Sequence, residues 1–154
     1  MPIFGALGDE ALAFLVSQTR MRQVPRGEYF FREGDAANSL YVLESGAVEV
    51  VRCWQQHERV VNQLGVGDCF GEMALLDLGP RSAAVRACAD CTAIELDAAD
   101  LYRLYEHDVA QFALVQMNLA REVSRRLRRT DELLFRAWME QGPPAAVSAA
   151  DYRG

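Results

Sequence analysis

Short β-rich segments punctuated by glycine fill residues 21–96, and they constrain the fold of this chain more than any other feature. We expect six strands, at residues 29–32, 39–44, 47–52, 59–64, 83–87 and 91–96. Strands this short, at this spacing, are typical of a small antiparallel barrel or roll. The pairs Ser-Gly at 45–46 and Ala-Asp at 89–90 are turn signals that predict hairpins, and residues 55–58 have the composition of an exposed loop.

Helical patterns flank the β-rich region. Asp9 is a candidate N-cap for a helix over residues 10–18. After the last strand we expect two helices, over residues 98–106 and about 109–140. The second of them carries a narrow stripe at spacings of three and four, formed by Leu119, Val123, Leu127, Thr130, Leu134 and Trp138. The predicted fold is therefore α+β, mainly β: an antiparallel, jelly-roll-like β-roll with an N-terminal helix and a C-terminal helical lid.

Length and composition fit one globular domain, which we assign to residues 1–140, with the roll over about 21–96 and the lid over about 98–140. The 154 residues are 51% hydrophobic and 25% charged, which are ordinary values for a globular protein. We expect residues 141–154, rich in alanine, proline and glycine, to form a disordered tail.

Net charge and hydropathy argue against two classes of function, DNA binding and membrane insertion. The net charge of −6 argues against direct DNA binding, and no apolar run approaches the roughly 18 residues of a membrane span. We therefore expect a cytoplasmic protein without membrane contact. The arginines of residues 121–129 are expected to form a solvated helix face with acidic neighbours.

The spacing of the cysteines and histidines does not favour a metal site or a redox-active disulfide. Cys88 and Cys91 have CxxC spacing, but no second pair lies at a useful distance, so we expect reduced, structural thiols. His57 and His107 lie alone in unrelated segments, and no metal site is predicted.

Residues 70–85, Phe-Gly-Glu-Met-Ala-Leu-Leu-Asp-Leu-Gly-Pro-Arg-Ser-Ala-Ala-Val, combine groups suited to a phosphorylated sugar. Gly71 permits close backbone approach, and a helix opening at Glu72 would direct free N–H groups at an anion. Arg81 offers a planar fork for two phosphate oxygens, with the Ser82 hydroxyl beside it. A carboxylate at Glu72 suits a neutral donor such as a sugar hydroxyl. Phosphate and hydroxyl on one ligand indicate a nucleotide.

This segment resembles the phosphate-binding cassette of cyclic-nucleotide-binding domains, the family that includes catabolite activator protein and kinase regulatory subunits. The similarity covers roughly residues 10–138 and includes Gly-Glu at 27–28, Phe-Arg-Glu-Gly-Asp at 31–35, Leu-Tyr-Val-Leu at 40–43, Gly-Ala-Val at 46–48 and Gly-Val-Gly-Asp at 65–68. The resemblance implies that Glu72 holds the ribose 2′-hydroxyl and Arg81 the cyclic phosphate. The predicted cassette contacts are Gly71, Glu72, Met73, Ala74, Arg81, Ser82 and Ala83.

Base recognition is predicted from the same resemblance. The purine would pack against apolar strand residues that also suit an ordinary core, namely Val50, Val61 and Leu64. Thr130 falls where catabolite activator protein reads the adenine amino group, although a mid-helix threonine also commonly bonds its own backbone. Asp131 departs from the family pattern at the next polar contact.

The predicted function is sensing rather than catalysis, because the cassette brings no nucleophile, base and orienting group together. The ligand would be cAMP in preference to cGMP, with no other cofactor, and binding would favour a closed position of the lid helix. We expect the output to pass to an unknown protein effector or through a homodimer formed by the long helix.

Two alternatives remain open. One is a ligand-independent interaction module that keeps a vestigial cassette. The other is a redox or metal sensor that uses Cys69, Cys88 and Cys91.

Overall fold

The computed structural model describes residues 2–77 and 79–142, and the chain divides into two compact units, Met1–Leu119 and Ala120–Gly154. The first unit holds the β-roll, and the second continues the last helix. The predicted tail lies outside the described residues except at 141–142, where the helix ends.

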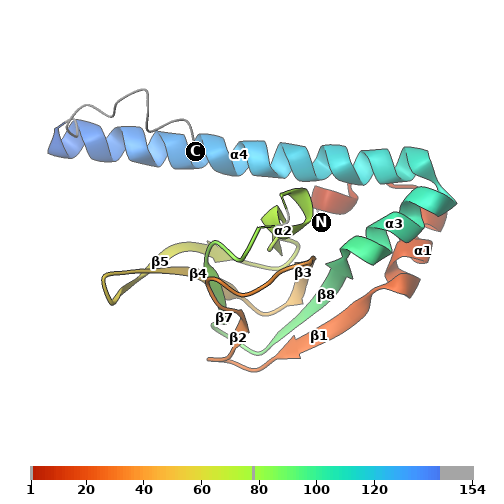
Figure 1. Ribbon diagram of the computed structural model, residues 1–154, viewed down its shortest axis with the longest axis horizontal. Helices are drawn as coiled ribbons and strands as arrows, with labels where there is room; N and C mark the ends of the chain where they lie inside the picture. Colours follow the sequence, from red (N-terminus) through yellow and green to blue (C-terminus); the bar gives the residue numbers. More distant parts are fainter. Residues whose placement is uncertain (1, 78, 143–154) are drawn as a thin grey trace. The chain divides into compact units, whose positions relative to one another are not determined.

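Eight strands form the roll of the first unit (Figure 1). The elements run in the order η1 (Pro2–Phe4), α1 (Asp9–Gln18), β1 (Arg20–Val24), β2 (Tyr29–Phe31), β3 (Ser39–Ser45), β4 (Val48–Trp54), β5 (His57–Leu64), β6 (Cys69–Phe70), α2 (Met73–Leu76), β7 (Ala84–Ala87), β8 (Cys91–Asp97), α3 (Ala98–His107) and α4 (Val109–Gln141). The strands pair antiparallel in two four-stranded sheets, of order β1-β8-β3-β6 and β2-β7-β4-β5. The predicted fold class is confirmed.

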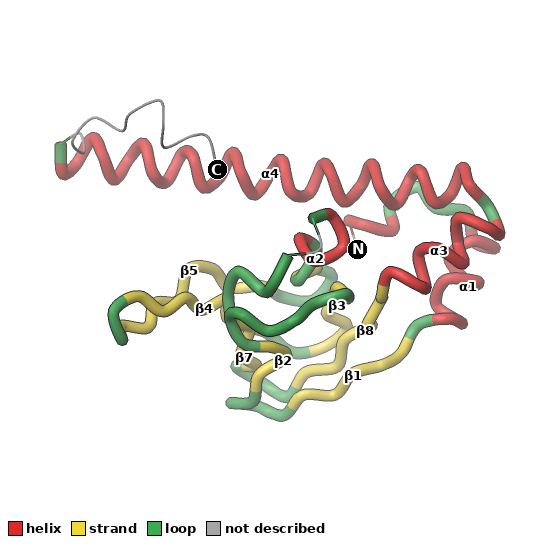
Figure 2. Tube along the Cα trace, viewed as in Figure 1, coloured by secondary structure: helices red, strands yellow, loops and turns green. Residues whose placement is uncertain are grey.

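Strand β3 divides the core into two layers, because its successive side chains face opposite ways. Leu40 and Val42 face the helices, where they pack with Leu15 of α1, Leu104 of α3 and Val115 of α4. In Figure 2, β1 and β8 lie side by side and lead to α1 and α3.

The second layer fills the space between the two sheets. Tyr41 and Leu43 of β3 pack there with Phe30, Val48 and Val85 from the other sheet. Four aromatic rings form one cluster in this layer, in which Tyr41 and Phe70 contact each other and both contact Phe30 and Phe31. A strand whose two faces are both buried reads as a nearly continuous apolar run, which is why the sequence of β3 predicts a strand so clearly.

Both predicted hairpin turns are wrong. Residues 45–46 join β3 to β4, and residues 89–90 join β7 to β8, but in each case the two strands belong to different sheets. A turn signal reports a local chain reversal, whereas pairing is decided by distant contacts. The hairpin is instead β4–β5, whose loop is only Gln55 and Gln56, with φ of 48° and 65°. A two-residue loop with positive φ at both positions matches the twist of paired strands, and His57 already belongs to β5.

The helix prediction needs one correction, at Asp9. Helix α1 begins at Asp9 itself, with Gly8 as the N-cap and no side-chain cap bond. An aspartate is favoured in the first turn as well as at the cap, so sequence alone does not separate the two positions.

Two strands escaped prediction, β1 and β6. Four of the five residues of β1 are exposed, and the strand lies at a sheet edge, where charged residues discourage pairing with other chains. Strand β6 has only two residues.

Helix α4 runs without a break through the boundary between the units. Its first part buries Val115, Asn118 and Leu119, and the Asn118 amide donates to the carbonyls of Ile3 and Gly5. From Ala120 to Gly142 no described side chain is buried. The exposed apolar residues of this second unit are Leu127, Leu133, Leu134, Phe135, Trp138 and Met139. No helix within the described ranges combines the length and apolarity that crossing a membrane requires.

Candidate functional site

The cassette begins at Gly71, between β6 and α2. Its φ is +79°, and a Cβ built there would lie 2.5 Å from Nη1 of Arg81 and 3.2 Å from the Ser39 carbonyl oxygen. Only glycine fits, because the backbone is left-handed and the arginine side chain occupies the space. Gly71 and Arg81 are thus packed together, ten residues apart in the sequence.

Helix α2 is a single turn, with Glu72 as its N-cap residue. Four residues carry little macrodipole, since that dipole sums over aligned peptide units. The N–H of Ala74 donates to the Gly71 carbonyl at 3.3 Å and so already has a partner. The expected anion cradle of free N–H groups is therefore much reduced, and Arg81 is the main positive charge of the site.

The backbone of Arg81 is anchored by the segment Phe-Arg-Glu-Gly-Asp at 31–35. Its N–H donates to the Asp35 carbonyl at 2.9 Å, and its carbonyl accepts from the Gly34 N–H at 2.8 Å. This segment, which the sequence analysis singled out without assigning it a role, fixes the arginine at the end of the roll.

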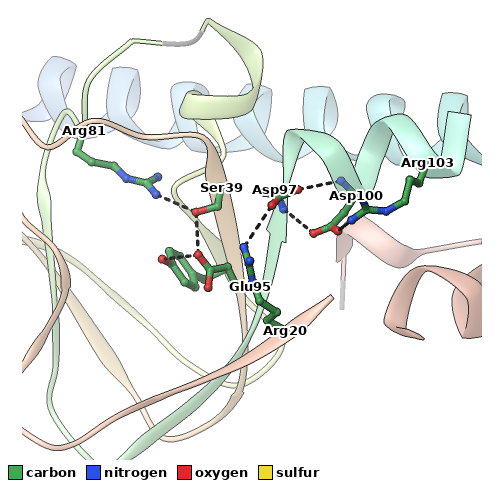
Figure 3. A network of polar contacts seen from close by, with 8 residues as sticks. Arg20, Ser39, Arg81, Glu95, Asp97, Asp100 and Arg103 are labelled. Atoms are coloured by element: carbon green, nitrogen blue, oxygen red, sulfur yellow. Dashed lines mark hydrogen bonds and ion pairs between the residues drawn. The ribbon is translucent and has the colours of Figure 1, made fainter. Parts of the chain in front are cut away.

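The Arg81 guanidinium is buried, with the residue only 7% exposed. Its Nη1 donates to the Gly71 carbonyl at 3.1 Å and its Nη2 to the Ser39 hydroxyl at 3.4 Å (Figure 3). One face of the guanidinium covers the Phe31 ring, with Cζ 3.9 Å from the ring centroid. Its Nε is buried and has no hydrogen-bond partner among the described residues. An unpaired buried donor is costly, so this edge of the fork is suited to an acceptor brought by a ligand.

No carboxylate forms an ion pair with Arg81 in the part of the chain that the structure describes. Burial lowers the pKa of Arg81, and the more distant charges of Tyr41, Glu95, Asp35 and Glu72 oppose that shift. The guanidinium remains charged because its ordinary pKa is so high. A buried cation without a direct counter-ion is an anion-binding arrangement.

Behind Arg81 lies a polar cluster that the sequence analysis missed. The Ser39 hydroxyl and the Tyr41 hydroxyl both bond Oε1 of Glu95, at 3.3 and 3.2 Å (Figure 3). Burial raises the pKa of Tyr41. A usable signal did exist, since Ser39 and Tyr41 are two residues apart in one strand and therefore share a face.

The remaining cassette residues differ in how far they are buried. Glu72 and Ala74 are buried, and Ala83 is 9% exposed. Ser82 is exposed, and its hydroxyl lies 3.7 Å from the Met73 sulfur. Because sulfur is a weak acceptor, this hydroxyl can turn readily toward a better one.

The predicted purine wall is only partly assembled. Leu64 is buried in the inter-sheet core, and Val50 packs against that core from a partly buried position. Val61 is 53% exposed, because the β4–β5 register passes from Val50↔Asn62 to Val51↔Val60 and leaves Val61 as the extra residue of a bulge. Val61 is therefore exposed and lies outside the core, and its place beside the purine stays a prediction.

In the second unit, the Thr130 hydroxyl donates to the Arg126 carbonyl at 2.9 Å, the backbone bond that is common for a mid-helix threonine. Glu122 pairs with Arg125 and Arg126, but the Glu122 and Arg126 side chains are only 14% and 24% exposed, so this part of the arginine cluster is less solvated than predicted.

None of the four cysteines forms a disulfide, and Cys69 and Cys91 are buried. Burial raises the pKa of Cys91, whose sulfur lies 3.2 Å from the carbonyl oxygens of both Ala47 and Ala89 and donates its single hydrogen to one of them at a time. Within the described ranges, no cluster of three or more metal-ligating side chains is present.

A β-roll that buries an arginine without a direct carboxylate partner, beside a glycine-opened turn, is suited to binding a small anion. Comparison with known proteins identifies the family to which this domain belongs. Residues 21–108 match the model of the cyclic nucleotide-binding domain. The chain belongs to this family.

Similar proteins include several regulators. The Cyclic AMP receptor protein of Thermus thermophilus is 37% identical over 131 residues, which are 84% of this chain and 59% of that protein. The CRP-like cAMP-activated global transcriptional regulator of Mycobacterium tuberculosis is 32% identical, over 86% of this chain and 58% of that protein. This chain thus spans less than two thirds of the length of these relatives.

Solved structures of related proteins have the same fold as this chain. The crystal structure of Thermus thermophilus Catabolite Activator Protein has a TM-score of 0.77 and 36% identity, covering 87% of this chain and 62% of that one. A cyclic nucleotide-binding domain from Methylobacillus flagellatus KT has a TM-score of 0.81 at 23% identity, covering 94% of this chain and 79% of that one, and supports the fold.

Proposed function

We propose that this protein senses cAMP, in preference to cGMP, and transmits binding through its C-terminal helix. The observation that carries the proposal is the buried Arg81, with its unpartnered Nε, beside Gly71. The names of the relatives that match most of the chain, a cyclic AMP receptor protein and a cAMP-activated regulator, support the choice of nucleotide.

Arg81 supplies the charge for the cyclic phosphate, which carries one negative charge. Its Nε and the unused hydrogens of its two terminal nitrogens provide charge-assisted donors that strengthen when an oxygen anion replaces solvent. We assign Ser82 to a phosphate oxygen, together with the backbone of Gly71 and Ala83. We assign Glu72 to the ribose 2′-hydroxyl, because a carboxylate accepts from a neutral hydroxyl and is repelled by the phosphate.

Base preference rests on weaker features. Some cGMP-selective relatives have a threonine directly after the cassette arginine, where this chain has Ser82. Thr130 supplies a hydroxyl suited to an adenine amino group, once that hydroxyl leaves its bond to the Arg126 carbonyl.

Signalling would proceed by population shift. A nucleotide that binds both the cassette and α4 favours the helix position in which both interactions form, by the free energy that the second interaction contributes. The exposed apolar side chains between Leu127 and Met139 offer the second unit a surface for a partner protein or for a second copy of this chain.

The test is a calorimetric titration of the protein with cAMP and with cGMP, repeated for Arg81→Ala. We expect one nucleotide per chain, tighter binding of cAMP, and a loss of at least about 100-fold for the variant, because bonds to charged groups contribute roughly 1.5–3 kcal/mol each. Arg86→Ala is the matched control, since Arg86 lies in β7 five residues further on and is ion-paired with Glu49 and Glu58.

Two outcomes would overturn the proposal. If wild type binds neither nucleotide, the cassette is vestigial and a ligand-independent interaction module takes its place. If wild type binds but Arg81→Ala binds equally well, the nucleotide occupies some other part of the molecule.

A further inference from the structure

Ser39 lies between the only buried arginine of the described residues and a carboxylate that does not touch that arginine. We infer that Ser39 is a positioning residue, which orients the Arg81 guanidinium for the ligand while leaving its charge unneutralised. This inference rests on the proposed function, because it assigns a role within the same anion site.

The strand register brings the cluster together. Ser39 and Tyr41 are alternate residues of β3, and Tyr41 pairs directly with Glu95 of β8. Alternate residues of a strand, and residues directly opposite each other on neighbouring strands, point to the same side of a sheet. That side is the inter-sheet interior, because Tyr41 packs in the inter-sheet core. The side chains of Arg81, Ser39 and Glu95 lie in succession in Figure 3.

The hydrogen count determines the direction of the bonds. Glu95 as a carboxylate can only accept, so the single hydroxyl hydrogen of Ser39 is donated to its Oε1. The lone pairs of Ser39 then face Nη2 of Arg81, which can only donate. Ser39 is 4% exposed, so water does not compete readily for either bond. The hydroxyl is therefore fixed from both sides, and it fixes one terminal nitrogen of Arg81 in turn.

A neutral contact at this point has an electrostatic consequence. A carboxylate in direct contact with Arg81 would neutralise the guanidinium and compete with the phosphate for the same donors. Because the Ser39 hydroxyl lies between them, the Glu95 carboxylate does not contact Arg81 directly. It influences the guanidinium only through the dipole of that hydroxyl and through longer-range electrostatic attraction. Gly71 and Ser39 each hold one terminal nitrogen and Phe31 covers one face, so Nε and the second hydrogen of each terminal nitrogen are left for the ligand.

The experiment compares Ser39→Thr with Ser39→Val, two side chains of nearly equal shape that differ by the hydroxyl. We expect the threonine variant to bind cAMP within about threefold of wild type and the valine variant about tenfold more weakly, because one oriented bond to a charged group is lost. Tyr29→Phe is the control: it removes a tyrosine hydroxyl that bonds Arg86, and we expect an affinity within about threefold of wild type.

A second readout needs no nucleotide. The Nε–H resonance of Arg81 in nitrogen-15 NMR spectra should exchange slowly with water in wild type and in Ser39→Thr, and at least about tenfold faster in Ser39→Val, because the guanidinium is no longer held. Equal exchange rates in all three proteins, or equal affinities for cAMP in the two variants, would overturn the inference. Absence of nucleotide binding in wild type, with the exchange difference intact, would overturn the proposed function alone.

Discussion

Two arginines of the roll lie beside aromatic rings but differ in their charged neighbours. Arg81 lies in the interior, and Arg86 lies on the outer face of the sheet that contains β7. Arg81, on the inside, stacks on Phe31 and contacts only neutral oxygens. Arg86, on the outside, lies 2.9 Å from a carboxylate oxygen of Glu49 and 3.2 Å from one of Glu58. Burial lowers the pKa of the first arginine, and hydrogen bonds to Glu49, Tyr29 and Glu58 raise the pKa of the second.

The difference separates stability from binding. Arg86 lies across from Tyr29 and Glu49 on the neighbouring strands, so its ion pairs form as soon as the sheet forms. Arg81 has no direct carboxylate partner within the described residues, and its burial carries a cost that an anionic ligand can offset. We therefore expect substitutions at the two positions to affect different measurements.

Arg81→Met gives the largest predicted effect. The substitution keeps a long side chain and removes the charge, so cAMP affinity should fall by at least about 100-fold. The free energy of unfolding without ligand should stay within about 1 kcal/mol of wild type, because removing a buried cation offsets the hydrogen bonds lost. Calorimetric titration and urea unfolding measure the two quantities. Destabilisation by more than about 2 kcal/mol would mean that Arg81 is structural.

Gly71→Ala should produce the next largest effect. The new Cβ would meet Nη1 of Arg81 at 2.5 Å and the Ser39 carbonyl oxygen at 3.2 Å, so the guanidinium must move. We expect cAMP affinity to fall by about 10- to 100-fold and the free energy of unfolding to fall by about 1–3 kcal/mol from backbone strain.

Gly67→Ala is the control for that strain. Gly67 has a φ of +89° and open space where the Cβ would lie, so the variant isolates the backbone cost. We expect similar destabilisation in the two variants but weaker binding only in Gly71→Ala. Equal affinities would show that Arg81 can rearrange without loss.

The sequence predicted the local parts of the candidate site. Gly71, Glu72 and Arg81 were predicted from their residue types and spacing, and the structure brings Gly71 and Arg81 into contact. Ser39 and Glu95 could not be assigned, because their relation to Arg81 depends on how β3 pairs with β8, far apart in the sequence. The pairing register between strands that are far apart in the chain cannot be predicted from the pattern of a single sequence.

The same limit explains the errors in the fold. Six of the eight strands of the roll were predicted from the sequence, whereas the sheet to which each strand belongs was not, so both hairpin predictions failed. The edge strand β1 lacks an apolar pattern because most of its side chains are exposed.

Arg86→Met addresses the other side of the comparison. Loss of the pairs with Glu49 and Glu58 should lower the free energy of unfolding by about 1 kcal/mol, because partly exposed ion pairs contribute little individually. The difference from wild type should shrink in about 1 M salt, at a Debye length of roughly 3 Å. Urea unfolding at low and high salt tests this, and cAMP affinity should stay within about twofold. A large loss of affinity would mean that the two regions are coupled through β7.

Ser82→Ala should have the smallest effect. Ser82 is exposed and its hydroxyl has only the Met73 sulfur, at 3.7 Å, so the free protein loses almost nothing on substitution. A phosphate oxygen is a far stronger acceptor than a thioether, and we expect cAMP affinity to fall by about three- to tenfold, the contribution of one hydrogen bond. Ser45→Ala, at an exposed strand end, is the matched control and should leave affinity unchanged. If Ser82→Ala also binds normally, Arg81 and the cassette backbone hold the phosphate by themselves, and the contrast between the two arginines accounts for the charge recognition of the site.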